Sequence, residues 1–175
     1  SHAQPNAAAL DVSVIIADSP LGEQFAAWVD DDQFEATRAM MQRVVQAAHA
    51  RGLKVFLVPH LWVESGEWRA LIDPGSDEAW SRWTEAYRAF LLTWAEVARE
   101  GGVELLSIGV ELRSWVTTPR AGSMLGIIED VRKIYPGLLT YSANWDDVGD
   151  TAILSALDLI GINAFYPLAE REGVE

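Results

Sequence analysis

Five short apolar runs alternate along the chain with longer segments that mix apolar and polar residues. The runs are rich in Val, Ile and Leu and are bounded by Gly, Pro or polar residues, as is typical of β-strands. They occupy residues 11–17, 54–58, 104–109, 138–143 and 159–163. Because nearly every position within them is apolar, we expect both faces of each strand to be covered.

The segments between the runs have the spacing of amphipathic helices. In residues 77–100 the large apolar side chains recur every three or four positions and therefore share one helical face. They are Trp80, Trp83, Tyr87, Phe90, Trp94 and Val97. Residues 33–50 and 120–135 are also predicted to be helices, and residues 151–157 a short one. Regular alternation of strand and helix predicts βαβ units and a parallel sheet, and thus an α/β fold.

Polar and aromatic residues gather where the predicted strands end. In βα barrels the active site lies at the carboxyl ends of the strands. The residues at or just after those ends are His60, Glu111, Asn144, Trp145, Asn163, Phe165 and Tyr166. Together they suit a sugar site, because they supply an acid, hydrogen-bonding groups for hydroxyls and aromatic stacking surfaces.

Glu111 is the candidate acid. It follows an apolar run and a glycine, so we expect its carboxyl group at the rim of the sheet in partly apolar surroundings. Burial of this kind raises the pKa of a carboxyl group, which suits a general acid. The alternative is a structural glutamate that forms a salt bridge with Arg113 or another basic residue.

Other candidates also have structural alternatives. His60 can cap the end of its strand, and Trp68 can anchor its own loop. Tyr166, which precedes a proline, can be structural. Trp145 lies in the polar run Asn-Trp-Asp-Asp and is better explained as a sugar platform than as a core residue, because core tryptophans seldom occur in such runs.

Composition and charge exclude several classes of partner and site. The chain has 13 Lys and Arg against 26 Asp and Glu, a net charge of −13 and a pI near 4.5, which argues against nucleic acid and anionic membranes as partners. The absence of cysteine excludes disulfides and Cys-based sites. No apolar run approaches the roughly 18 residues of a membrane span. Glycine-rich nucleotide motifs and metal-ligand triads are also missing, so we expect no cofactor and no metal.

Four sequence blocks, each straddling a strand end, carry a family resemblance. They are RGLKVFLVPHLWVESGEWRALI (51–72), LLSIGVELRSW (105–115), LTYSANWDDV (139–148) and LDLIGINAFYPL (157–168). In this order they resemble glycoside hydrolase family 113, which belongs to a clan of retaining (β/α)8 glycosidases and whose characterised members are β-mannanases. The resemblance spans residues 11–168 and implies a fold of the (β/α)8 TIM-barrel type.

The resemblance also implies roles for single residues. Glu111 matches the acid/base glutamate after the fourth barrel strand, with Val110 where the family usually has Thr. Trp62 stands where the family often has Asp. We expect nine residues to bind substrate: His60, Trp62, Trp68, Arg69, Asn144, Trp145, Asn163, Phe165 and Tyr166. Asn163 is included because of its position at a strand end and not because of the resemblance.

The chain represents only part of such a barrel. By block order residues 11–17 correspond to the second strand and residues 159–163 to the sixth, so about five of the eight βα units are expected. A retaining glycosidase needs a second carboxyl group about 5–5.5 Å from the acid/base. In the resembled family this nucleophile is a Glu after the seventh strand, so we expect it outside this chain. Nothing marks the tail glutamates as strand-end nucleophiles; these are Glu170, Glu172 and Glu175.

We interpret residues 1–10 as a cloning scar and lead-in, and residues 11–175 as a partial TIM-barrel domain. Three explanations stay open: a part of a longer enzyme, strands supplied by another chain, or a truncated domain that binds glycan without cleaving it. The sequence predicts a glycoside hydrolase that cleaves β-linked, mannan-type polysaccharide by a retaining two-carboxylate mechanism. The alternative is a non-catalytic carbohydrate-binding domain on the same scaffold. Because the expected partner is an oligo- or polysaccharide, we expect an extracellular or periplasmic location.

Overall fold

One parallel sheet organises the chain. The structure is a computed structural model that describes residues 7–16, 32–63 and 66–166. Its five strands follow the order β1-β2-β3-β4-β5, so each strand pairs with its neighbour in sequence. The predicted α/β fold with a parallel sheet is confirmed. The strands are β1 (Ala7–Ile16), β2 (Lys54–Val63), β3 (Leu105–Val110), β4 (Leu138–Asn144) and β5 (Leu159–Asn163).

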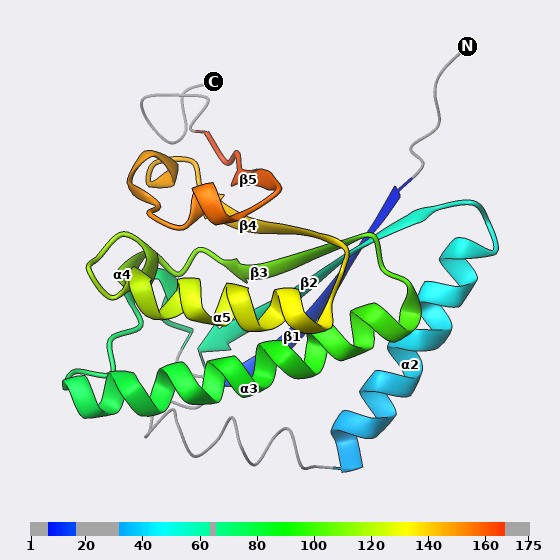
Figure 1. Cartoon of the computed structure of the whole chain (residues 1–175), viewed down its shortest axis with the longest axis horizontal. Helices are drawn as coiled ribbons and strands as arrows, with labels where there is room; N and C mark the ends of the chain where they lie inside the picture. The colour runs from blue at the N-terminus through cyan, green and yellow to red at the C-terminus, as the bar shows by residue number, and fades with distance from the viewer. Residues whose placement is uncertain (1–6, 17–31, 64–65, 167–175) are drawn as a thin grey trace, which may run out of the picture.

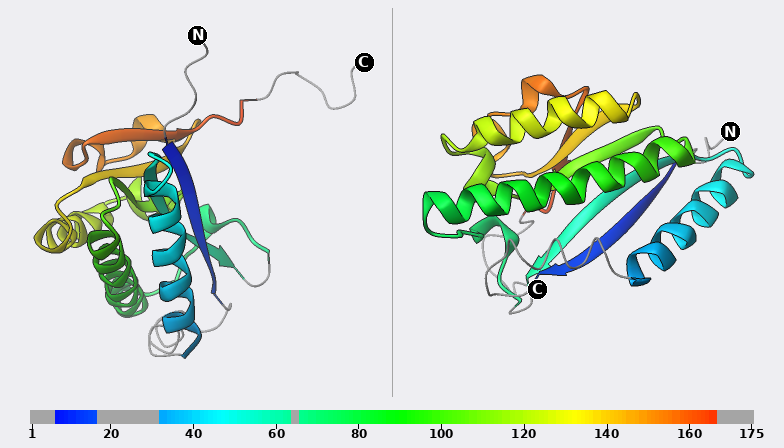
Figure 2. Two further views of the ribbon diagram at one scale, coloured as in Figure 1. Left: turned by 90° about the vertical axis from the view of Figure 1, so that its right-hand side faces the viewer. Right: turned by 60° about the horizontal axis from the view of Figure 1, so that its bottom comes forward.

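Three long helices connect the first four strands and lie along one face of the sheet (Figures 1 and 2). Consecutive crossover helices share a face because parallel βαβ connections are almost always right-handed. The three are α2 (Asp32–His49), α3 (Asp77–Gly101) and α5 (Ala121–Ile134). The shorter segments are η1 (Arg69–Leu71), α4 (Arg113–Val116), η2 (Val148–Asp150) and η3 (Leu154–Ala156).

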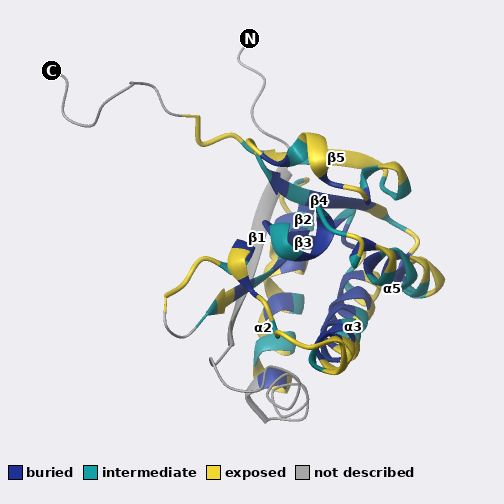
Figure 3. Ribbon diagram, turned by 90° about the vertical axis from the view of Figure 1, so that its left-hand side faces the viewer, coloured by how far each residue is buried: buried dark blue, intermediate teal, exposed yellow. Residues whose placement is uncertain are grey.

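Helix α3 supplies much of the core. The Ser76 side chain accepts a hydrogen bond from the Ala79 N–H and caps its start, and Gly102 ends it in the left-handed region at φ 69°. All the aromatic residues on its predicted apolar face are buried (Figure 3). Burial of each such side chain stabilises the fold by roughly 1.5–3 kcal/mol.

Strand β2 is longer than its apolar run predicts. We expected it to end at residue 58, before Pro59, but it continues to Val63. The reason is β1, which pairs with β2 along its whole length, whereas the ladder with β3 includes only Phe56 and Leu57. His60 and Trp62 therefore lie within a strand and not in the loop after it.

Other boundaries also differ from the predictions. β1 begins at Ala7, so residues 7–10 pair with β2 and do not form a lead-in; residues 1–6 and the tail glutamates Glu170, Glu172 and Glu175 lie outside the described residues. The predicted helix at residues 151–157 is wrong. The range holds only the 3-10 turn η3, and η2 precedes it, because the chain must return at once to the sheet, where the Asp158 N–H donates to the Leu139 carbonyl.

Strand β5 is the last of the sheet, and the described part of the chain places no strand beyond it (Figure 3). Its aliphatic side chains are largely exposed; Ile160 is 60% exposed. In an ordinary α/β sheet such residues are covered on both faces. The β5 edge of the sheet thus leaves aliphatic side chains uncovered by the described part of the chain.

Candidate active site

A β-bulge directs the end of β3. Ser107 pairs with Thr140, but Val110 pairs with Ser142, so three steps along β3 match two along β4. The extra residue is accommodated next to Gly109, whose carbonyl accepts a hydrogen bond of 2.8 Å from the Ser107 hydroxyl. A bulge of this kind bends the strand and changes the direction of the next side chain.

The next side chain is that of Glu111. Its backbone φ is 50°, and it is the one non-glycine residue with positive φ among those that the structure describes. Its N–H donates to the carbonyl of Ser142 on β4 at 2.9 Å. The bulge and this conformation turn the carboxyl group of Glu111 toward the open face of the sheet, at the carboxyl end of β3.

Three side chains hold the Glu111 carboxylate. Oε2 accepts hydrogen bonds from Trp68 Nε1 at 3.0 Å and from Arg69 Nη2 at 2.6 Å. Oε1 accepts one from Asn163 Nδ2 at 2.8 Å. Only 6% of the residue is exposed. A carboxylate buried this far needs such partners, because it has lost its water.

The basic partner of Glu111 is not Arg113, the residue named as the alternative from sequence. Arg113 lies at the start of α4 and pairs with Asp146 and Asp147, at 3.5 Å in each case. The partner is Arg69 in η1, which also donates from Nε to the Val110 carbonyl at 3.1 Å. Arg69 therefore binds both the backbone and the acidic side chain at the end of β3.

The predicted rise in the pKa of Glu111 is wrong. Burial raises this pKa, as expected, but hydrogen bonds from Asn163 and Trp68 to the carboxylate lower it. The positive charge of Arg69 and the electrostatic effect of His60 lower it further. The net result is a pKa below the ordinary glutamate value, because these groups all favour the ionised form.

Glu111 faces a cavity of about 560 Å³ on the sheet face opposite the long helices. The His60 and Trp62 rings stack at 5.1 Å, and the Arg69 guanidinium lies 5.6 Å from the Trp62 ring centre. Trp62 and Phe165 are 49% and 80% exposed, so part of each aromatic side chain is accessible from the solvent. The lining residues are Phe56, Val58, His60, Trp62, Arg69, Val110, Glu111, Ser142, Asn163 and Phe165.

The remaining predicted site residues lie at the ends of β4 and β5. Trp145 and Tyr166 form a ring pair with centres 5.4 Å apart, and both are exposed. Asn144 ends β4 and its Oδ1 accepts a hydrogen bond from the Trp145 N–H at 3.0 Å. None of these three lines the cavity. The predicted residues thus form one cluster around Glu111 and a second, aromatic pair at neighbouring strand ends.

The sequence model of Glycoside Hydrolase Family 113 matches residues 21–174. This chain belongs to glycoside hydrolase family 113. The resemblance drawn from the four sequence blocks is therefore confirmed. No curated protein matches the chain.

Solved structures agree with this assignment. A GH113 β-mannanase from Alicyclobacillus acidocaldarius, in complex with ManMIm, is 32% identical with a TM-score of 0.70 over 74% of this chain and 42% of that chain. A GH113 β-1,4-mannanase complex is 27% identical with a TM-score of 0.68 over 76% and 44%. A fungal β-1,4-galactanase, 16% identical with a TM-score of 0.51 over 90% and 51%, supports the fold alone. The family 113 chain is thus a partial (β/α)8 barrel that spans less than half the length of these mannanases.

Four residues that line the cavity in this family 113 chain were not predicted as site residues from sequence: Phe56, Val58, Val110 and Ser142. Val110 directly precedes Glu111. Phe56 and Val58 lie on the same face of β2 as His60, because alternate residues of a strand share a face. Reading backward in steps of two from His60 finds both. Ser142 has no such local signal, since it reaches the cavity only through the pairing of β4 with the bulged β3.

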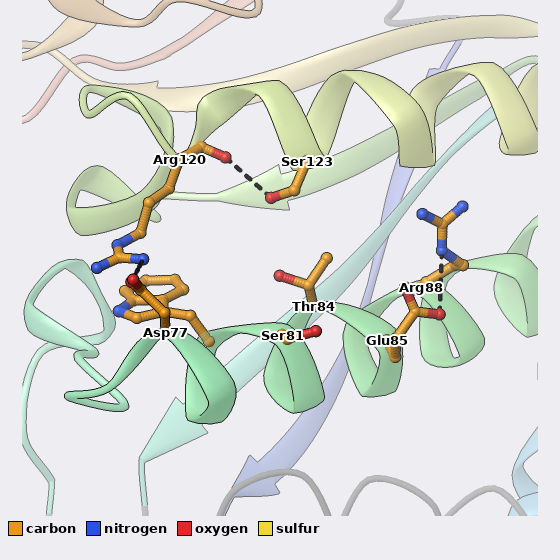
Figure 4. A pocket seen from close by; sticks show the side chains of 8 residues that line it. Asp77, Ser81, Thr84, Glu85, Arg88, Arg120 and Ser123 are labelled. Atoms are coloured by element: carbon orange, nitrogen blue, oxygen red, sulfur yellow. Dashed lines mark hydrogen bonds and ion pairs between the residues drawn. The ribbon is translucent and has the colours of Figure 1, made fainter.

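A second cavity of the family 113 chain, about 370 Å³, lies between α3 and α5 on the helical side (Figure 4). Its charged side chains are already paired. Arg120 binds Asp77 at 2.8 Å and covers the Trp80 ring, and Arg88 pairs with Glu85 and Asp130. These pairs leave no charged group directed at a ligand. None of the residues predicted at the strand ends lines this cavity, so we assign it no catalytic role.

Two other kinds of feature are absent from the described residues. No group of three or more His, Asp or Glu side chains there has an arrangement that would hold a metal ion. Among the described helices, none combines the length and apolar character needed to cross a membrane.

Proposed function

We propose that the chain carries the acid/base half of the active site of a retaining glycoside hydrolase that acts on β-linked, mannan-type polysaccharide. One observation carries the proposal. Glu111 is a buried carboxylate fixed by three donors at the carboxyl end of a barrel strand, and it faces a cavity with exposed aromatic rings. Mannanases among the structural relatives support the choice of sugar.

In the first step Glu111 gives a proton to the glycosidic oxygen while the bond from that oxygen to the sugar C1 breaks. A second carboxylate, supplied from outside this chain, forms a bond to C1. In the second step Glu111 takes a proton from water, whose oxygen replaces the carboxylate at C1. The exposed rings of Trp62 and Phe165 stack on sugar faces, and His60 binds hydroxyl groups.

The low pKa of Glu111 fits this scheme only when the second carboxylate is present. A negative charge about 5–5.5 Å away raises the pKa of a neighbouring carboxyl group. Among the described residues Glu111 is the single carboxylate that lines the cavity. We therefore propose that the group completing the site also converts Glu111 from a bound anion into an acid. Since the substrate is a polymer, we also propose an extracellular or periplasmic location.

One observation favours the alternative of a glycan-binding domain without catalysis. The ionised Glu111, already occupied by three donors, behaves as a structural anion in the described cavity. Sugar rings would then be held by the same aromatic side chains with no bond cleaved. The two functions differ in whether Glu111 ever transfers a proton.

The test supplies the missing nucleophile from solution. The chain is incubated with mannotetraose, whose leaving sugar departs only with a proton, and with azide. Azide attacks C1 from the face opposite the leaving group, and as an anion beside Glu111 it also replaces the charge of the second carboxylate. We expect α-mannobiosyl azide from the wild type and none from Glu111→Gln, while both bind mannotriose with similar affinity. Glu100→Gln, which alters an exposed carboxylate paired with Arg38, is the matched control and should behave as wild type.

The outcomes separate the two functions. Binding without azide product in the wild type would establish the glycan-binding alternative. Azide product that is equal in the wild type and in Glu111→Gln would remove Glu111 from the acid role. Absence of any binding to mannotriose would overturn the choice of sugar.

A further inference from the structure

The turn after β3 is held by β4 and not by its own strand. The Glu111 N–H donates to the Ser142 carbonyl at 2.9 Å, and the next N–H, that of Leu112, donates to the Tyr141 hydroxyl at 2.6 Å. Two successive amides therefore bind two successive residues of β4. Between them lies the positive φ of Glu111, a conformation that residues with a Cβ atom normally avoid.

Tyr141 is built into this position. It is 1% exposed, and burial raises the pKa of its hydroxyl far above the ordinary tyrosine value, so the group stays neutral. Its ring reaches the turn because position 109 is glycine: a Cβ atom there would lie 3.2 Å from Cε2 of Tyr141. Leu112 is also buried, so its N–H has no water to replace the tyrosine oxygen.

We propose that Tyr141 is a positioning residue for Glu111. By accepting the Leu112 N–H, its hydroxyl keeps the Glu111 backbone in the left-handed region and so keeps the carboxylate within reach of Trp68, Arg69 and Asn163. The inference rests on the proposed function, in which Glu111 is the acid/base. It adds to the proposed site a residue, Tyr141, that does not contact the sugar and acts only through the backbone of Glu111 and Leu112.

The test is Tyr141→Phe, which removes one oxygen and leaves the ring. Two controls remove the same atom from other buried tyrosines, whose hydroxyl groups donate to backbone carbonyls in or just before β3. They are Tyr87→Phe, which loses a bond to Ile108, and Tyr135→Phe, which loses a bond to Val103. The measurement is the pKa of the Glu111 carboxyl group, obtained by ¹³C NMR titration of the chain.

We expect the pKa of Glu111 to rise toward the ordinary glutamate value in Tyr141→Phe, because the carboxylate moves away from the three donors that lower it. In both controls it should stay as in the wild type. An unchanged pKa in Tyr141→Phe would overturn the inference. A rise of the same size in all three variants would also overturn it, since a general loosening of the core would then be the cause.

A second measurement uses the wild type and does not depend on whether a variant folds. The Leu112 amide should exchange with solvent as slowly as that of Leu106, a buried residue of β3. Exchange on the order of 100-fold faster would mean that the turn opens locally, and the inference would fail. Neither measurement involves hydrolysis. Failure of the azide experiment with a normal shift in Tyr141→Phe would reject the proposed function alone.

Discussion

The guanidinium group of Arg69 lies 2.6 Å from the carboxylate of Glu111, although the two residues are 42 positions apart in the chain. Both side chains are nearly buried, at 11% and 8% exposure. The pair therefore joins the segment after β2 to the end of β3 at the point where a substrate would meet the acid. Removal of either partner leaves a charge with little water to compensate it.

Arg69→Met should therefore destabilise the chain and raise the pKa of Glu111. We expect the free energy of unfolding to fall by about 3 kcal/mol, the usual cost of breaking a buried pair. Urea denaturation measures this loss. Arg38→Met is the control: it breaks an exposed pair with Glu100 at 2.7 Å, so its cost should stay below about 1 kcal/mol. Equal losses in the two variants would contradict the prediction.

The pH dependence of stability should carry the signature of Glu111. Its folded pKa is lowered from 4.5, so the ionised group stabilises the folded state above pH 4.5, and this contribution is lost as pH falls through the folded pKa. We expect the stability difference between the wild type and Glu111→Gln to be largest at neutral pH and to shrink below pH 4.5. Denaturation at several pH values gives both curves. A difference that is constant down to pH 3 would disprove the lowered pKa.

Gly109→Ala should disturb the bulge. The added Cβ would lie 3.0 Å from the Tyr87 hydroxyl and 3.1 Å from a Leu112 methyl group, with no room to move in a buried site. A loss of about 1–3 kcal/mol is expected, typical of overpacking. The control is Gly122→Ala in α5, where no atom lies within 4 Å; it should stabilise the helix by about 0.5–1 kcal/mol. Thermal unfolding of both variants tests this difference in stability. Destabilisation of both variants would contradict the prediction.

Trp145→Ala tests the aromatic pair at the ends of β4 and β5. The Trp145 ring is exposed and contacts Tyr166, so its loss should change stability little. If the pair is a sugar platform, mannotriose binding measured by calorimetry should weaken about 10-fold, or about 1.4 kcal/mol. Trp145→Phe, which keeps an aromatic face, should retain most of the affinity. Unchanged binding in Trp145→Ala would assign the pair a structural role.

Local sequence patterns correctly predicted a strand and the buried face of a helix, because both depend mainly on neighbouring residues. The run at residues 159–163 is β5 with the same bounds, and the spacing from Trp80 to Val97 gives the buried face of α3. Strand ends and the family resemblance together selected Glu111 and most residues of its cavity. Their assignment to binding and catalysis stays a prediction.

The features that could not be predicted from the sequence depend on residues far apart in the chain. The donors that set the pKa of Glu111, Trp68 and Asn163, are 43 and 52 positions away, so burial alone suggested the wrong direction. Strand β2 passes Pro59 because β1 pairs with it there, and no local signal reports that pairing. The bulge is visible only when β3 and β4 are aligned.

The order of the sheet has a consequence for synthesis on the ribosome. Every strand pairs with its predecessor, so each βα unit can dock as soon as it emerges. The donors to Glu111 do not emerge together: Trp68 and Arg69 precede it, whereas Asn163 follows it and belongs to β5. The Glu111 carboxylate can therefore bind Trp68 and Arg69 first. The growing chain completes the anion site only when β5 pairs with β4 and brings Asn163 to the carboxylate.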